Sequence, residues 1–386
     1  MEVIGIIAEY NPFHNGHLYH INKIKERYPN SILIAVISGE FTQRGHISIL
    51  DKHAKTKICL DNNIDIVVKL PTFYSVQSAD LFAYGAVLIL NNLKVNKIII
   101  GSEQDNIGQL EKVAKVQLNN PIFEEKVKYY LDQKVNSQTS ISSSIKHLLG
   151  YTVTEPNDIL GVCYLKAIIN NDFKISVETI KRTNNFHDNT SNNSIISASN
   201  IRHKIENNID ISKYVPASVN DYLNIDKNDN YFKLLKYKIM TNITTLNTFL
   251  SVDEGIENKI KKTIFNCNSL EELISSVKNK RYTYNKLTRM FTHILLNIKK
   301  LDVEKYKDID YINILGFNQV GRSHLNTIKK NPIPITSNIN KLDNGLERYS
   351  TSIYDLIYDY NNSLTTVLTK GIPYIKEVED EHIWLY

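Results

Sequence analysis

Two imidazole side chains lie three residues apart near the start of the chain, with a glycine between them. His14, Gly16 and His17 belong to residues 5–17, which read GIIAEYNPFHNGH. An apolar run before them predicts a strand, the polar residues predict a turn, and residues 16–27 predict a helix. The first N–H groups of a helix are free to bind an anion, and glycine permits close backbone approach. The pattern predicts a phosphate site, and its alternative is a surface turn with incidental histidines.

A second candidate anion site lies near the middle of the chain, in residues 196–202, which read ISASNIR. Ser197 or Ser199 can cap a helix, and Arg202 follows three residues after Ser199. Free N–H groups, hydroxyls and a guanidinium together suit a phosphate. The alternative is an ordinary helix cap.

These two motifs need a scaffold, and the first half of the chain alternates strand and helix patterns. Strands are predicted at residues 3–8, 31–38, 64–70, 97–101 and 175–180, and helices at residues 16–27, 51–60, 78–93, 106–149 and 156–170. The strands are nearly continuous apolar runs, which favours an α/β fold whose parallel sheet is covered by helices on both faces. Ligands of such sheets bind at the carboxyl ends of the strands.

Polar residues follow several of these strands, and together they predict the rim of a pocket. Residues 39–45 (GEFTQRG) follow the second strand, residues 101–103 (GSE) follow the fourth, and Arg182 follows the fifth. Gly101 predicts a close approach of a nucleotide ring or ribose to the backbone. Arg44 is a candidate for contact with an anion or RNA, and a plain surface arginine is the equal alternative.

The alternation stops near residue 205, and the patterns beyond it are mostly helical. Helices are predicted at residues 231–240, 256–265, 270–277 and 284–301. We therefore predict two domains, residues 1–205 and residues 206–386. Residues 278–289 (KNKRYTYNKLTR) interleave cations with tyrosines, which suits RNA phosphates and bases as well as a solvated helix face. Residues 314–322 (ILGFNQVGR) predict a compact loop that packs the domains together or contacts RNA.

Composition excludes several classes of protein. The 386 residues carry 46 basic and 41 acidic side chains, and the resulting charge of +5 does not by itself require a nucleic-acid partner. Cys59, Cys163 and Cys267 lack zinc spacing and indicate reduced structural residues. No apolar run approaches the ~20 residues of a membrane span, and the start does not resemble a signal peptide. We therefore expect a soluble cytoplasmic protein that has no membrane partner.

The two motifs resemble the signatures of the HIGH-type nucleotidyltransferases. Residues 14–17 match the His-x-Gly-His signature, and residues 196–202 are similar to the serine- and threonine-rich turn that ends in Ile-Arg. No Lys-Met-Ser-Lys-Ser pattern is present, which argues against a class I aminoacyl-tRNA synthetase. Nine segments over most of the chain more closely resemble the bacterial tRNA(Met) cytidine acetate ligases: GIIAEYNPFHNGHLYHI, SGEFTQRG, DIVVKLP, QSADLFAYGAV, IIIGSE, PNDILGVCYLKAI, SASNIR, KRYTYNKLTRMFTHIL and ILGFNQVGR.

The resemblance implies a fold and a reaction. The fold is a Rossmann-like nucleotidyltransferase sheet with helices on both faces, followed by a mainly helical C-terminal domain that binds tRNA. The co-substrate is ATP, with Mg²⁺ present, and acetate attacks its α-phosphorus to give acetyl-adenylate and pyrophosphate. The wobble cytidine of elongator tRNA(Met) then takes the acetyl group on N4, which yields N4-acetylcytidine and AMP.

The resemblance also implies site residues. The residues expected to hold phosphates and act in catalysis are His14, His17, Ser199 and Arg202. The residues expected to bind ATP are Ile7, Ala8, Glu9, Tyr10, Asn11, Pro12, Phe13, His14, Asn15, Gly16, His17, Leu18, Tyr19, His20, Gly101, Asn157 and Arg182. Candidate tRNA contacts are Arg281, Lys286, Arg289 and Arg322. No residue is expected to ligate a metal ion directly, and the Asn-rich residues 184–194 match no motif.

Two other functions share part of this pattern. An adenylyltransferase for a small phosphorylated substrate would carry both motifs, but it would leave the basic, tyrosine-rich helical half unexplained. An RNA-binding protein with an inactive nucleotide site is the other alternative, and the intact His14, His17, Ser199 and Arg202 argue against it. The sequence singles out no general base for the attack by cytidine.

Overall fold

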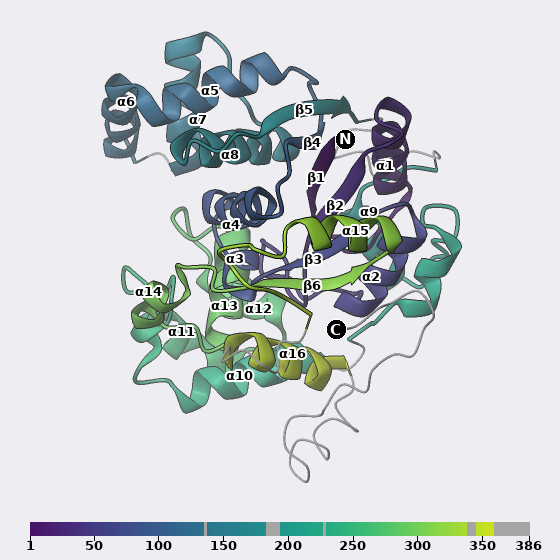
Figure 1. Cartoon of the computed structure of the whole chain (residues 1–386). Coiled ribbons are helices and arrows are strands. Elements are labelled where there is room, and N and C mark those ends of the chain that lie inside the picture. The colour runs from purple at the N-terminus through teal and green to yellow at the C-terminus, as the bar shows by residue number, and fades with distance from the viewer. Residues whose placement is uncertain (135–136, 183–193, 227–228, 338–344, 359–386) are drawn as a thin grey trace.

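One sheet forms the centre of the molecule (Figure 1). The structure is a computed structural model that describes residues 1–134, 137–182, 194–226, 229–337 and 345–358. Within these residues the sheet has seven strands in the order β5-β4-β1-β2-β3-β6-β7. The strands are β1 (Val3–Ala8), β2 (Ile32–Ser38), β3 (Ile66–Leu70), β4 (Lys97–Ser102), β5 (Ser176–Lys181), β6 (Ile312–Phe317) and β7 (Ile335–Thr336).

The first five strands are all parallel, and each is joined to the next through helix. Strand β6 is antiparallel to β3, and β7 pairs with β6 in the parallel sense. The carboxyl ends of β1 to β5 therefore meet at one edge of the sheet. The predicted α/β fold class, with a parallel sheet and a helical C-terminal region, is confirmed.

Helices cover both faces of the sheet because apolar side chains point alternately to each face along the strands. Along β2, Leu33, Ala35 and Ile37 share one core with helices α1 (Asn15–Arg27) and α2 (Lys52–Asp61). The intervening β2 residues share the other core with α4 (Ala79–Asn92) and α8 (Pro156–Asn170). Helix α2 begins after its N-cap residue Asp51, whose carboxylate accepts the His53 and Ala54 N–H groups.

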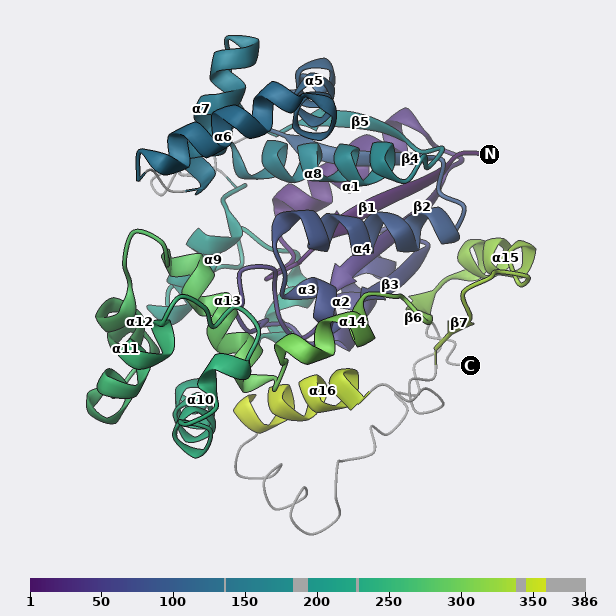
Figure 2. The ribbon, with the colours of Figure 1, turned by 90° about the vertical axis from the view of Figure 1, so that its left-hand side faces the viewer.

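The remaining helices surround this layered centre, and Figure 2 shows α5 to α7 outside α8 at the top. They are α3 (Thr72–Ser75), α5 (Ile107–Asn119), α6 (Pro121–Asp132), α7 (Ser137–Leu149), α9 (Ala198–Glu206), α10 (Asn230–Thr241), α11 (Ile256–Thr263), α12 (Leu270–Val277), α13 (Tyr284–Leu295), α14 (Val303–Tyr306), α15 (Gln319–Thr327) and α16 (Gly345–Tyr358). The helical region predicted at residues 106–149 is thus three helices. The Asn-rich residues 184–194 lie outside the described residues except for Ser194.

The prediction of a compact loop at residues 314–322 is wrong. Residues 314–317 belong to β6, and residues 319–322 open α15. Gly316 does not mark a turn, because a Cβ there would lie 2.6 Å from Cγ2 of Thr56, so this glycine lets α2 pack closely against β6. The sheet therefore takes two of its strands from the second half of the chain.

Residues beyond 205 also share a core with the first half of the chain. Buried side chains of α10 and α13, such as Leu235 and Phe291, belong to the same core as α4 and α8. A buried ion cluster at the carboxyl ends of β2 and β3 attaches α16: Lys69 Nζ lies 2.6 Å from a Glu40 oxygen and 2.7 Å from a Glu347 oxygen. The domain boundary at residue 205 stays a prediction.

Two further expectations concern cysteines and membranes. Cys59, Cys163 and Cys267 are buried and free, as predicted. In the part of the chain that the structure describes, every helix is too short or too polar to cross a lipid bilayer.

Candidate active site

The first turn of α1 is capped by the predicted histidines themselves. His14 is the N-cap residue, and its Nδ1 accepts the Gly16 N–H at 3.0 Å. The His17 Nδ1 in turn accepts the His14 N–H at 3.2 Å. This reciprocal arrangement is a capping box in which imidazole nitrogens replace the usual hydroxyl and carboxylate oxygens. The local sequence therefore places both rings at the positive end of the helix dipole.

These hydrogen bonds assign the tautomers of the two histidines. Because each Nδ1 is an acceptor, each ring carries its proton on Nε2 and offers that N–H as a donor. Burial, aided by the charges of Arg182 and Arg202, lowers the pKa of His14 to about 3. Burial also lowers the pKa of His17, with a further contribution from His14. Both rings are therefore neutral N–H donors at neutral pH.

Close packing holds the two histidine rings in place. The rings of His14 and His17 stack with centroids 3.7 Å apart and an interplanar angle of 24°. Tyr10 and Phe13 pack against His17 with ring centroids 4.7 and 5.5 Å away. Gly16 is required here because a Cβ would lie only 2.8 Å from Cε1 of His14.

The second motif forms the start of α9 and is joined to the first. Ser197 is the N-cap, and its Oγ accepts the Asn200 N–H at 3.2 Å and lies 2.9 Å from the Ser199 Oγ. Arg202 donates from Nη1 to the Asn11 carbonyl at 2.6 Å, which joins α9 to the turn before α1. We call His14, His17, Ser199 and Arg202 the anion cradle, since the structure brings them together at two helix N-termini.

A third group of predicted residues lies at the ends of β4 and β5. The Arg182 N–H donates to the Ser102 carbonyl at 2.9 Å, and its side chain passes Gly101, where a Cβ would lie 3.5 Å from the Arg182 Cγ. Asn157, at the start of α8, donates to the Glu103 carboxylate, whose Oε1 also lies 3.6 Å from the Arg182 Nε. Arg182 also depresses the pKa values of His14 and His17, so this group adjoins the anion cradle.

The other residues predicted to bind ATP follow the path of the chain from β1 into α1. Ile7 and Ala8 end β1, and Leu18, Tyr19 and His20 lie in α1. Burial is the first cause, and Arg182 the second, that lowers the pKa of His20 to about 4. Glu9 accepts the Gln43 N–H at 2.6 Å, a contact between the first two strand ends that the sequence did not reveal.

The loop after β2, residues 39–45, is mostly buried against other elements. Glu40 is buried and forms ion pairs with Lys52 at 3.1 Å and Lys69 at 2.6 Å, so the prediction that it lines the rim of a pocket is wrong. Gly45 has a φ of +83°, and a Cβ there would lie 2.5 Å from the Arg289 Cα of α13. This loop therefore connects the sheet edge to the helical region.

The four candidate tRNA contacts do not form one group. Arg281 is exposed and pairs with Glu254 at 3.2 Å, and the Lys286 ammonium lies 4.0 Å from the Tyr282 ring centroid. Arg289 is half-buried, and its Nη1 donates to the Gln77 carbonyl at 3.1 Å, so it joins α13 to the core. Arg322 lies on α15, which is apart from α13 in both views (Figures 1 and 2).

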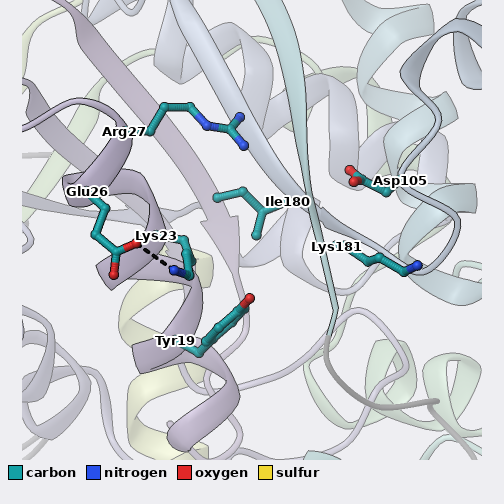
Figure 3. Close-up of a pocket in the computed structure, with 7 residues that line it drawn as sticks. All are labelled: Tyr19, Lys23, Glu26, Arg27, Asp105, Ile180 and Lys181. Atoms are coloured by element: carbon teal, nitrogen blue, oxygen red, sulfur yellow. Dashed lines mark hydrogen bonds and ion pairs between the residues drawn. The ribbon is translucent and has the colours of Figure 1, made fainter.

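An open pocket of about 450 Å³ lies beside the site, between α1 and the edge strand β5 (Figure 3). Its walls carry Lys23 and Arg27 from α1 and Lys181 from β5. Of the residues predicted to bind ATP, only Tyr19 lines it. The four cradle residues do not line this pocket.

The arrangement suits a nucleotide whose phosphates lie over two helix N-termini.

The family model described as HIGH Nucleotidyl Transferase matches residues 1–368. The tRNA(Met) cytidine acetate ligase of Anoxybacillus flavithermus is 36% identical over 358 residues, which cover 88% of this chain and 89% of that protein. The apo crystal structure of Thermotoga maritima TmcAL superposes with a TM-score of 0.84 at 27% identity over 93% of this chain and 95% of that one. The structure of the same protein bound with alpha-thio ATP gives 0.81, with the same identity and coverage. The chain therefore belongs to the HIGH nucleotidyl transferase family and, within it, to the tRNA(Met) cytidine acetate ligases.

Proposed function

We propose that this protein is an ATP-dependent ligase that acetylates the wobble cytidine of elongator tRNA(Met). Acetate attacks the α-phosphorus of ATP, which releases pyrophosphate and forms acetyl-adenylate. The cytidine N4 amine then attacks the acyl carbon and forms the new C–N bond. The bond from this carbon to the phosphate oxygen breaks, AMP leaves with the electron pair, and one N4 proton passes to water. The names of the relatives support the substrates, and we place the reaction in the cytoplasm, with its tRNA.

The observation that carries the first step is the pairing of two helix N-termini in the anion cradle. His14 and His17 present neutral Nε2–H donors, Ser199 adds a hydroxyl and Arg202 adds a permanent charge. Acetate needs no general base, because its pKa is near the ~4.3 of a glutamate side chain and it is ionised at neutral pH. It needs positioning and neutralisation of phosphate charge, and each such donor is worth about 10²–10³ in rate.

The residues present fit ATP. They fit Mg²⁺ only as an ion that is bound to the phosphates of ATP. Gly101, Asn157 and Arg182 adjoin the cradle on the side of β4 and β5 and would hold the nucleoside end. Among the described residues, no group of three His, Cys, Asp or Glu side chains could hold a metal ion. Mg²⁺ is commonly held by substrate phosphates and water rather than by a protein cage, and it would neutralise phosphate charge.

The tRNA contacts are proposed on the helical region, where Arg281 is exposed while the other two candidate contacts of residues 278–289, Lys286 and Arg289, are half-buried. Arg281→Ala should weaken tRNA binding and lower the slope of log affinity against log salt by about 1, because one phosphate contact is lost. A filter-binding titration at several salt concentrations measures both values. An unchanged salt slope would place the tRNA backbone elsewhere.

The reaction is tested by measuring AMP formation from ATP while acetate and tRNA are each supplied or omitted. We expect AMP only when acetate is present and more AMP when tRNA(Met) is added, with an acetyl group on the tRNA by mass spectrometry. AMP formation at the same rate with and without acetate would refute the acetate ligase. Pyrophosphate release that depends instead on a small phosphorylated acceptor, with AMP joined to that acceptor, would favour an adenylyltransferase. ATP binding without turnover would favour an RNA-binding protein with an inactive site.

A further inference from the structure

Two aromatic rings face one another beside the anion cradle, and the first reaction step does not use them. His46 lies in the loop after β2 and Tyr284 is the first residue of α13. Their ring planes are inclined by 28°, and their centroids are 6.3 Å apart. Tyr284 is 39% exposed, so its ring is open to a ligand.

The spacing of these rings is that of loosely packed aromatic neighbours, whose centroids lie about 4.5–7 Å apart. The stacked rings of His14 and His17 in the same protein lie 3.7 Å apart. A flat ring inserted between two parallel rings needs about 6.8 Å, which is twice the ~3.4 Å rise of stacked bases. The 6.3 Å separation of His46 and Tyr284 is below that spacing, so a base would stack on the exposed face of Tyr284 and not between the two rings.

Hydrogen bonds and tight packing hold both rings on one rigid unit. The Thr288 hydroxyl of α13 donates to the Arg44 carbonyl at 2.6 Å, and the Thr292 hydroxyl donates to the Gly45 carbonyl at 2.6 Å. The left-handed backbone of Gly45 lets the loop lie directly on the Arg289 backbone. The distance between the rings is therefore set before any ligand binds, which reduces the entropy that binding must overcome.

The rings also lie next to the cradle. The Arg202 guanidinium donates a hydrogen bond to the backbone carbonyl of Asn11 at 2.6 Å. The side-chain carbonyl of Asn11 accepts the Ile49 N–H at 2.9 Å. The Asn11 amide donates to the carbonyl of Ile47, the neighbour of His46, at 3.4 Å. Burial, with Arg202 and Arg44, lowers the pKa of His46 to about 4, so its ring is uncharged at neutral pH.

We propose that His46 and Tyr284 form the binding site for the nucleobase that receives the acetyl group, with the base stacked on the Tyr284 ring. This inference rests on the proposed function and assigns its second substrate a position. Stacking of a base on an aromatic side chain contributes about 1–3 kcal/mol and needs no charge. A base held here lies beside Arg202, at the edge where the adenylate forms, so its exocyclic amine is brought to the acyl carbon. His46 and Tyr284 are positioning residues.

The test separates the two half-reactions in the full-length protein. Acetate-dependent exchange of pyrophosphate into ATP, without tRNA, reports adenylate formation, and acetylation of tRNA(Met) reports the complete reaction. Tyr284→Ala should lower kcat/KM for tRNA acetylation by about 10–100-fold and leave the exchange rate within twofold of wild type. Tyr284→Phe, which keeps the ring, should retain most of the activity. Tyr237→Ala is the matched control, because Tyr237 is 69% exposed on α10.

Three results would overturn the inference while leaving the proposed function intact. Tyr284→Ala could acetylate tRNA like wild type, it could lose exchange and acetylation equally, or Tyr284→Phe could be as impaired as Tyr284→Ala. His46→Leu removes the other ring and must likewise lower tRNA acetylation while the exchange rate is retained. This variant tests the inference if Tyr284→Ala does not fold. A wild-type protein without acetate-dependent exchange would instead refute the proposed function.

Discussion

Replacement of Gly16 by alanine should inactivate the anion cradle while the chain still folds. The new Cβ would lie 2.8 Å from Cε1 and 3.0 Å from Nδ1 of His14. The shorter distance is about 0.6 Å below the 3.4 Å at which ordinary contact begins, so the ring must move. The Nδ1 of His14 also accepts the Gly16 N–H at 3.0 Å, so any such movement lengthens the bond that orients the ring.

The expected loss of rate is about 10²-fold, since misplacement of a catalytic donor by less than 1 Å approaches the cost of losing the donor. Gly16 does not have a positive φ, and alanine is the better helix former by up to about 1 kcal/mol, which offsets part of the ~1–3 kcal/mol cost of displacing the buried ring, so the melting temperature should fall by only a few degrees. Acetate-dependent exchange of pyrophosphate into ATP measures the first effect, and thermal unfolding measures the second.

Gly108 provides the matched control, because it is the second residue of α5 as Gly16 is the second residue of α1. A Cβ at Gly108 would meet only the Asn106 Oδ1 at 3.7 Å. Gly108→Ala should therefore keep full activity. Exchange by Gly16→Ala within threefold of wild type would refute the role of the His14 ring position, and the loss of a cooperative unfolding transition would show that the fold is affected instead.

Three further outcomes are expected. His17→Ala and Arg202→Ala should each lower the exchange rate by about 10²–10³-fold and leave tRNA binding nearly unchanged; equal loss of tRNA affinity would contradict a cradle devoted to phosphates. Because the pKa of His14 in the folded protein is about 3, below its ordinary 6.5, the unfolded chain takes up a proton first and the free energy of unfolding should fall as the pH drops from 6.5 toward 3. His14→Gln should make that decline shallower by up to about 1.4 kcal/mol per pH unit, and an identical decline in urea titrations would argue against a neutral His14. Lys69→Met should lower the free energy of unfolding by about 3–5 kcal/mol, because it leaves the buried Glu40 and Glu347 carboxylates without their shared cation; a urea midpoint close to that of wild type would contradict this.

The elements predicted with most success are those with a strong local signal. Continuous apolar runs predicted all five parallel strands, and capping chemistry predicted the start of α9. Strand β6 escaped prediction because its six residues are followed by polar residues and include Gly316, which is typical of a turn. The reason for that glycine, the close approach of Thr56, lies on another element.

Local patterns were enough to predict the parallel sheet, the strand–turn–helix at His14 to His17 and the serine cap before Arg202, because periodicity and helix capping act between neighbours in the chain. Tertiary structure alone decided which distant groups meet. It bonds Arg202 to Asn11, encloses Glu40 between two lysines, turns Arg289 onto Gln77 and sets Tyr284 opposite His46. Such contacts depend on the packing of whole elements across the sheet edge. The residues that neighbour a charged or aromatic side chain in the sequence do not indicate which distant residue it will contact.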